Sequence, residues 1–258
     1  MKKPADLFAG IDLARIPAMQ SETAILATAI FCASFAVSGQ TLDDVLARMR
    51  KAAGGEERLR SVSSERLTGT FSIRGGKPSS LVIELSRPGR IRVEADLSRG
   101  TFVGGFDGAR AWQVNPQLVP GRATGLPPAL AAKIADLADI DGPLWRARVR
   151  GEETRLAREA IEGGVPTLRI AQGTKESPSV LTVNRETWRV LAWRGRLDPR
   201  RPEIEVRFED YEETDGVFLP RCVRIGSPGG PDRIVVELSR VEIDPEIDDV
   251  WFTPPASP

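Results

Sequence analysis

Apolar and polar residues alternate along much of this chain with the period of a β-strand. In residues 90–97 an apolar side chain occupies every second position from Ile91 to Leu97, and charged side chains occupy the positions between them. Residues 204–209 repeat the pattern, and residues 234–238 repeat its apolar positions. A period of two with one apolar side predicts strands that bury one face and expose the other to water.

Turn signals rich in Gly, Asn and Asp separate many segments of this kind. The predicted strands, besides residues 90–97, are residues 67–73, 81–85, 101–106, 154–161, 167–171, 180–183, 188–193, 203–211, 218–225 and 233–243. Asp107-Gly108 predicts a two-residue type I′ hairpin, which requires positive φ at both central positions. So many one-faced strands predict a strongly curved antiparallel sheet wrapped around its own apolar face, or a barrel.

Two segments have helical spacing instead. Thr41 and Asp44 approximate a capping box, an apolar stripe follows them, and Gly54 ends the predicted helix. The second helix begins after Pro127-Pro128 and carries apolar residues at helical spacing, including Leu130 and Ile134. Both helices are amphipathic, so each is expected to pack its apolar side on the sheet. With many strands and only two helices, the predicted fold class is mainly β with few helices (α+β).

Residues 1–39 are predicted to be a signal peptide. Residues 24–37 form an apolar run that is short for a bilayer span, and small residues follow it around Ser38 and Gly39, where we expect cleavage. Translation from Met19 would account for the unusual length of the segment. The alternative is an uncleaved membrane anchor.

Residues 40–258 are predicted to form a single domain, because they contain no Pro/Ser-rich linker, no change of composition and no repeat of fixed period. The chain has 258 residues and 41% hydrophobic content, which is enough to bury a sizeable core. Cys222 would be the one cysteine left after cleavage, and its place in a strand pattern predicts a buried structural thiol.

Charge and composition exclude several classes of function. Lys and Arg number 36 and so do Asp and Glu, so no net charge favours nucleic acid as a partner. Histidine is absent, which removes the commonest general base, the usual Ser and Cys nucleophile systems and the commonest zinc ligand. Acidic runs at 209–215 and 244–249 lack calcium-loop spacing and are interpreted as solvated. The sequence therefore predicts no catalytic residues, no metal site and no cofactor.

The turn-linked strands carry a resemblance to a known family. RPGRIRVE at 87–94 is followed by FDGARAW at 106–112 and a Pro. The other segments that agree, in the same order, are residues 52–76, DIDGPLW at 139–145, FEDYEETDGVFLPRCVRI at 208–225 and VEIDPEIDDVWFTPP at 241–255. Together they span nearly all of the chain after residue 40, and as an ordered set they resemble the outer-membrane lipoprotein-sorting proteins and their LolA-like relatives.

This resemblance implies an incomplete β-barrel, covered by the N-terminal helix and by a lid-like helix, around an apolar cavity. The predicted cavity residues are Ile83, Leu85, Ile91, Val93, Val206 and Phe208, with Leu130 and Ile134 on the lid helix. A static helix over a core filled by its own side chains fits the same residues. The sequence does not separate an open cavity from a filled one.

The function implied by the resemblance is that of a periplasmic carrier, which shields the acyl chains of lipoproteins or lipids. Such a carrier requires no cofactor, works with membrane-bound proteins that load and unload it, and is expected to be a monomer. The alternative is a non-transporting periplasmic sensor or protein-interaction domain of the same fold.

Overall fold

A computed structural model of the protein describes residues 40–255, except 117–120, 143, 146–147, 149–150, 175–177 and 197–200. The predicted signal peptide, residues 1–39, lies outside the described residues. No helix in the described part of the chain is both long and apolar enough to cross a membrane.

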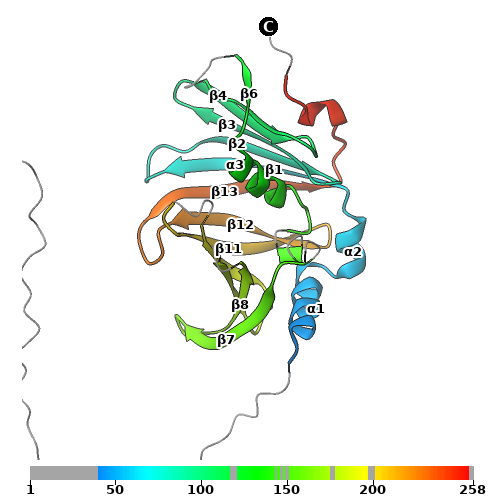
Figure 1. Ribbon diagram of the computed structural model, residues 1–258, viewed down its shortest axis with the longest axis vertical. Coiled ribbons are helices and arrows are strands. Elements are labelled where there is room, and N and C mark those ends of the chain that lie inside the picture. The colour runs from blue at the N-terminus through cyan, green and yellow to red at the C-terminus, as the bar shows by residue number, and fades with distance from the viewer. Residues whose placement is uncertain are drawn as a thin grey trace, which may run out of the picture. The chain divides into compact units, whose positions relative to one another are not determined.

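The fold is built on one 13-stranded antiparallel sheet with the order β6-β5-β4-β3-β2-β1-β13-β12-β11-β10-β9-β8-β7. The strands are β1 (Ser64–Ile73), β2 (Ser79–Ser86), β3 (Arg90–Leu97), β4 (Gly100–Phe106), β5 (Ala111–Val114), β6 (Ala123–Gly125), β7 (Thr154–Glu162), β8 (Val165–Gly173), β9 (Pro178–Asn184), β10 (Val190–Gly195), β11 (Ile204–Thr214), β12 (Val217–Gly226) and β13 (Asp232–Ile243). The sheet curves strongly and stays open, with β6 and β7 at its edges (Figure 1). The mainly β, curved antiparallel architecture predicted from the alternating pattern is confirmed.

The centre of the sheet is a pairing between β1 and β13, which lie far apart in the sequence. Leu67 lies opposite Val241, but Gly69 lies opposite Leu238, so β13 contains one extra residue at this point. Such a β-bulge resets the alternation of side chains along the strand. As a result Leu238 and Val241, which are three residues apart, project from the same face of the sheet.

The helices lie where the sequence predicts them, with additions. α1 (Leu42–Ala53) has a complete capping box between Thr41 and Asp44 and ends at Gly54. α3 (Pro128–Leu137) begins at its Pro. The sequence patterns did not reveal the short helix α2 (Glu56–Ser61) or the 3₁₀ helix η1 (Asp249–Phe252).

One turn differs from its prediction. The turn between β4 and β5 spans Asp107 to Arg110, and the backbone N–H of Asp107 donates to the carbonyl of Arg110. Gly108 has positive φ (99°), but Asp107 does not. The side chain of Asp107 instead accepts from the N–H groups of Ala109 and Arg110 at 2.8 and 2.7 Å. The type I′ prediction was therefore wrong, because Asp107 is the first residue of the turn, where its side chain accepts hydrogen bonds, and is not one of the two central residues.

The face of the sheet that carries η1, here called the outer face, is dominated by ion pairs. Examples are Arg66 with Glu84 at 2.8 Å, Arg224 with Glu209 at 2.8 Å and Arg207 with Asp232 at 2.6 Å. The two acidic runs, interpreted as solvated, contribute to these pairs: Asp244 pairs with Arg58, and Asp249 pairs with Arg90. Each exposed pair contributes little to stability, so these acids act mainly by keeping the outer face polar.

Cys222 is buried, as predicted for a structural thiol. Its side chain is 4% exposed and has no disulfide partner within the described residues. Burial raises the pKa of the thiol above its ordinary value. A neutral, buried thiol is a poor nucleophile.

Candidate functional site

The face opposite η1, here called the inner face, is covered at one end by α1. Val45, Leu46 and Met49 of this helix form one cluster with buried side chains of β8 and β9. Ile170 and Val183 in this cluster are completely buried (0% exposed). Trp193 and Trp188 pack against its border. This end of the inner face is filled by the protein's own side chains.

The other end of the inner face is covered by α3. Ala131, Ile134 and Ala138 pack over a cluster that contains Leu85, Ile91 and Phe106 of the sheet. Leu85 and Ile91 are each 7% exposed, so no open space of ligand size separates them from the helix. At this end the helix covers a filled core.

Between these ends, two rows of apolar side chains cross β1, β13, β12 and β11. Residues directly opposite one another in adjacent strands project from the same face. The first row is Ile73, Ile234, Ile225 and Val206, and the second is Phe71, Val236, Val223 and Phe208. We call these residues the open rows. None of them is fully buried, Ile73 is 52% exposed, and they belong to neither helix-covered cluster of the described chain.

The predicted cavity residues divide between these regions. The structure places Ile83, Leu85, Ile91 and Val93 together beneath or beside α3, and Val206 and Phe208 in the open rows. On α3, Ile134 packs onto the sheet, whereas Leu130 is 41% exposed. All six sheet residues therefore lie on the inner face, but not around one common space. That they bind a ligand stays a prediction.

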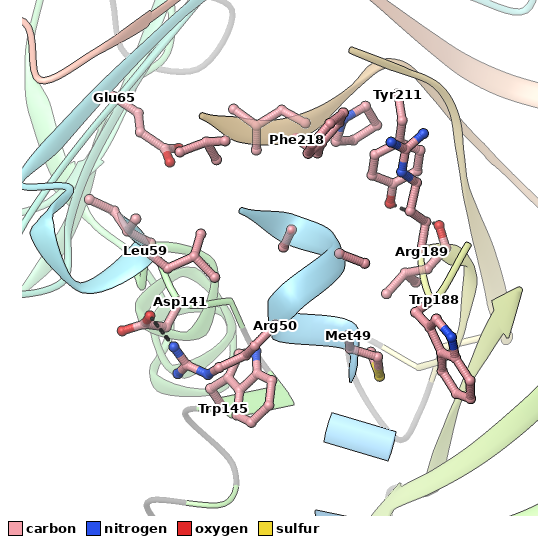
Figure 2. A pocket seen from close by; sticks show the side chains of 17 residues that line it. Met49, Arg50, Leu59, Glu65, Asp141, Trp145, Trp188, Arg189, Tyr211 and Phe218 are labelled. Atoms are coloured by element: carbon pink, nitrogen blue, oxygen red, sulfur yellow. Dashed lines mark hydrogen bonds and ion pairs between the residues drawn. The ribbon is translucent and has the colours of Figure 1, made fainter. Parts of the chain in front are cut away.

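A pocket lies further along β11 and β12, beyond the open rows. Figure 2 shows it between α1, the segment after α3 and the beginning of β12. Its volume is about 220 Å³. The lining is mostly apolar and aromatic, from Met49, Ala52, Ala53, Leu59, Ile140, Trp145, Trp188, Val190, Val217, Phe218, Leu219 and Pro220. Phe208 in the open rows and Tyr211 at the pocket are three residues apart on β11, or roughly 10 Å along a strand. The open rows and the pocket are therefore neighbouring features of β11 and β12, although no open-row residue lines the pocket.

Two arginines hold one wall of the pocket in place. Arg87, in the β2–β3 turn, donates to Asp141 at 2.8 Å and to the carbonyls of Val62 and Leu59 at 2.7 and 3.2 Å. Arg50 of α1 pairs with Asp141 at 3.5 Å and stacks on Trp145, with its guanidinium carbon 4.2 Å from the ring centroid. Burial alone would raise the pKa of Asp141, but the hydrogen bond and charge of Arg87 lower it below its ordinary value.

Aromatic side chains form the opposite wall. The guanidinium of Arg189 lies over the rings of Phe218 and Tyr211, 4.5 and 5.5 Å from their centroids. The hydroxyl of Tyr211 donates to the carbonyl of Val190 at 2.8 Å. Burial raises the pKa of this hydroxyl, so it stays neutral and keeps its hydrogen bond. The wall presents ring faces and a cation toward the pocket (Figure 2).

Glu65 is the buried acid of the pocket. It is 6% exposed and lies on the inner face, opposite Leu85 on one side and Ile243 on the other. Burial, opposed by the charge of Arg87, raises the pKa of its carboxyl from 4.5 to about 7. A carboxyl with this pKa changes charge near neutral pH.

Sequence reasoning did not select any of these polar pocket residues. For Glu65 a signal existed, because it shares the apolar phase of β1 with Leu67 and Phe71 and is the residue that breaks it. Trp188 and Arg189 carried no comparable signal. They precede β10, and Arg189 meets Tyr211 of β11 and Phe218 of β12 only because β10, β11 and β12 are successive strands of the sheet. Trp145 and Trp188 line the pocket, whereas Trp112 donates to the carbonyl of Phe252 on the outer face.

No three metal-ligating side chains converge anywhere in the described part of the chain. The pocket has a mostly apolar lining to which arginines and the buried carboxyl of Glu65 add charged groups. This chemistry suits binding.

Solved structures identify the fold. No family model and no curated protein matches the sequence. A DUF1329 family protein from Desulfovibrio piger is 15% identical, with 81% of this chain and 95% of that chain covered and a TM-score of 0.56. A domain from Vibrio parahaemolyticus described as an outer membrane lipoprotein-sorting protein is 9% identical, with 81% and 94% covered and a TM-score of 0.58. A LolA superfamily protein from Nitrosomonas europaea is 13% identical, with 83% and 97% covered and a TM-score of 0.56.

The chain has the LolA-like fold. The likeness extends over nearly the whole of each related structure, so the LolA-like fold accounts for the described domain rather than for a fragment of it. At 9 to 15% identity the LolA-like fold says how the sheet and helices are arranged, and not which molecule the inner face binds.

Proposed function

We propose that the protein is a periplasmic binding or carrier protein that shields the acyl chains of lipids or lipoproteins on the inner face of its sheet. The observation that carries the proposal is the pair of open rows, because their apolar side chains face away from the ionic outer face and are covered by neither α1 nor α3. Burying an acyl chain contributes roughly 0.8 kcal/mol per CH₂. Binding of this kind requires no catalytic residue, metal or cofactor.

The comparisons support the same proposal at the level of the fold. One structural neighbour is described as an outer membrane lipoprotein-sorting protein domain and another as a LolA superfamily protein. We extend a carrier role to this chain because it combines their fold with an apolar inner face. Export to the periplasm, monomeric state and membrane-bound loading and receiving proteins are parts of the proposal.

The experiment is mass spectrometry of lipids extracted from protein purified without detergent from the periplasmic fraction of cells that express the full chain. We expect an acyl lipid or acylated peptide in near-stoichiometric amount. The variant Phe71→Glu places a charge in the open rows and should lose the lipid. Ser72→Glu is the matched control, because Ser72 is the next residue of β1 and projects from the outer face.

Phe71 is a better test position than Ile91. Ile91 is 7% exposed beneath α3, so a charge there would disrupt the core, whereas Phe71 is half-buried. Circular dichroism should show both strand variants folded. If neither purified protein nor protein supplied with lipid binds any acyl chain, the carrier proposal is wrong and a protein-interaction domain of the same fold takes its place.

A further inference from the structure

Glu65 occupies a position on the inner face of the sheet whose neighbours on adjacent strands are apolar. Its register neighbours across the inner face are Ile243 on β13, Leu85 on β2 and then Ile91 on β3. The next residue of β1 with the same orientation is Leu67. A charged residue in such a row interrupts the alternation of apolar inner and polar outer side chains. Departures of this kind from the local sequence pattern are expected at functional sites.

The arginines near Glu65 form ion pairs with other acids, although Nη1 of Arg50 is buried without a hydrogen-bond partner among the described residues. Arg87 donates to Asp141 and to two backbone carbonyls. Arg50 pairs with Asp141 and Glu56. Arg58 pairs with Asp244, which also accepts from the N–H of Ser63. Within the described residues, the carboxylate of Glu65 receives neither a hydrogen bond nor a salt bridge.

This arrangement leaves a buried acceptor that faces the pocket without a partner. Glu65 is 6% exposed and lines the pocket (Figure 2). Its carboxylate oxygens are not among the fully buried polar atoms that lack a partner, so they reach the space of the pocket. A carboxylate that has lost most of its hydration and has no donor destabilises the folded protein by up to about 1–3 kcal/mol. A donor carried by a ligand would remove that penalty, and the gain would appear as affinity.

We propose that Glu65 is the acceptor for an N–H group in the head of the bound amphiphile, whose chain lies along the open rows. The inference rests on the proposed function and names the chemistry of the head. The N–H can belong to the amide of an acylated peptide or to the amine of a lipid. Both fit because each carries a donor N–H, and among the described residues that line the pocket Glu65 is the one carboxyl that receives neither a hydrogen bond nor a salt bridge.

The charge state of Glu65 makes the proposal sensitive to pH. The charged groups around Glu65 are Arg87 from the β2–β3 turn, Asp141 from the segment after α3, Asp244 after β13 and Arg50 of α1. With these groups in place the pKa of Glu65 is about 7. An ammonium head favours the ionised carboxylate and should bind more tightly as the pH rises through 7. A carboxylate head should show the opposite dependence.

The test compares ligands that share one chain and differ in the head. Dodecylamine, N-dodecanoyl-glycinamide, methyl dodecanoate and dodecanoate are titrated into lipid-stripped full-chain protein. Binding is followed by calorimetry and by tryptophan fluorescence, to which the pocket residues Trp145 and Trp188 contribute. We expect the two N–H ligands to bind at least about tenfold more tightly than the methyl ester at pH 8.

Variants separate the two sources of the N–H group. In Glu65→Leu the affinities of the two neutral ligands, N-dodecanoyl-glycinamide and methyl dodecanoate, should lie within about threefold of each other. Glu65→Gln keeps an acceptor but has no charge, so it should lose the preference for the amine and keep that for the amide. Glu242→Gln is the matched control, since Glu242 is an acid on the outer face of β13 that pairs with Arg240.

The outcomes also separate this inference from the proposed function. If all four ligands bind equally in the wild type and in Glu65→Leu, the head-group inference is wrong and the acyl-binding function stands. If dodecanoate binds most tightly at every pH, the inference is overturned in favour of an anionic head. If none of the ligands binds, both proposals fail.

Discussion

Arg87 and Asp141 join two segments that the sheet alone does not connect. The Nη1 atom of Arg87, in the turn between β2 and β3, lies 2.8 Å from Oδ2 of Asp141, in the segment that follows α3. Arg50 of α1 approaches the other carboxylate oxygen at 3.5 Å. One carboxylate therefore ties α1, the β2–β3 turn and the wall of the pocket together.

We expect Asp141→Asn to destabilise the domain by about 2 kcal/mol, because two partly buried guanidinium groups lose a charged acceptor. The pKa of Asp141 is lowered in the folded protein, so its contribution is present above the ordinary value of 3.8 and is lost as the pH falls through the folded pKa. Urea unfolding at pH 7 and pH 3 checks both points. Glu203→Gln removes an exposed pair with Arg194 and should change stability little.

Glu65 is expected to give the free energy of unfolding the opposite pH dependence. Its pKa is raised to about 7, so the folded protein binds more protons than the unfolded chain between 4.5 and 7. Stability should therefore fall as the pH rises through this window, by about 3 kcal/mol at most. Glu65→Gln should remove this dependence and be more stable than the wild type at pH 8 but not at pH 4.5.

Thermal unfolding of both proteins across this range, without ligand, measures the difference. If Glu65→Gln is less stable than the wild type at pH 8, the side chain has a partner in solution that the structure does not show. That result would also weaken the case for a ligand donor.

Gly69 is expected to tolerate no side chain. A Cβ at this position would lie 2.0 Å from the carbonyl oxygen of Glu237, in the backbone of the bulged strand β13. Gly69→Ala should therefore cost about 3 kcal/mol or more, because backbone must move on both strands. Gly125→Ala, in edge strand β6, meets nothing within 4 Å and is the control. Guanidinium unfolding of the two variants tests the difference.

The 3₁₀ helix η1 is expected to contribute strongly to stability despite its length. Phe252 is completely buried (0% exposed), and its carbonyl accepts from the indole N–H of Trp112 at 2.8 Å. Phe252→Ala should cost about 3–5 kcal/mol through the cavity it leaves. Val250→Ala, in the same helix but at a side chain that is 65% exposed, should be almost neutral. A small effect of Phe252→Ala would mean that η1 detaches readily from the outer face.

Local patterns predicted the elements of this fold because each element is amphipathic on its own. The capping box of Thr41 and Asp44 marks the start of α1, and alternation marks β3 and β11. The register was beyond sequence reasoning, since the bulge opposite Gly69 depends on how β1 meets β13. A local pattern also states which side of a strand is apolar without stating what covers it.

The candidate site shows the same limit. Ile91 and Val206 have the same alternating environment in the sequence, yet one is buried beneath α3 and the other lies in the open rows. The difference arises from where the helices dock, which is a tertiary property. Glu65 was missed for a related reason, because a single acid in a strand is ordinary until its neighbours across the sheet are known.

The pairing of β1 with β13 has a consequence for how the protein folds during synthesis. The side chain of Ser239 in β13 donates to the carbonyl of Thr68 in β1, a residue 171 positions earlier. The strands from β1 to β6 and those from β7 to β13 form two separate series of neighbours, and this one seam joins them (Figure 1). A ribosome must therefore release almost the whole domain before the seam can close. Until then β1 and β13 each lack this neighbour, and the two series of strands are not joined into one sheet.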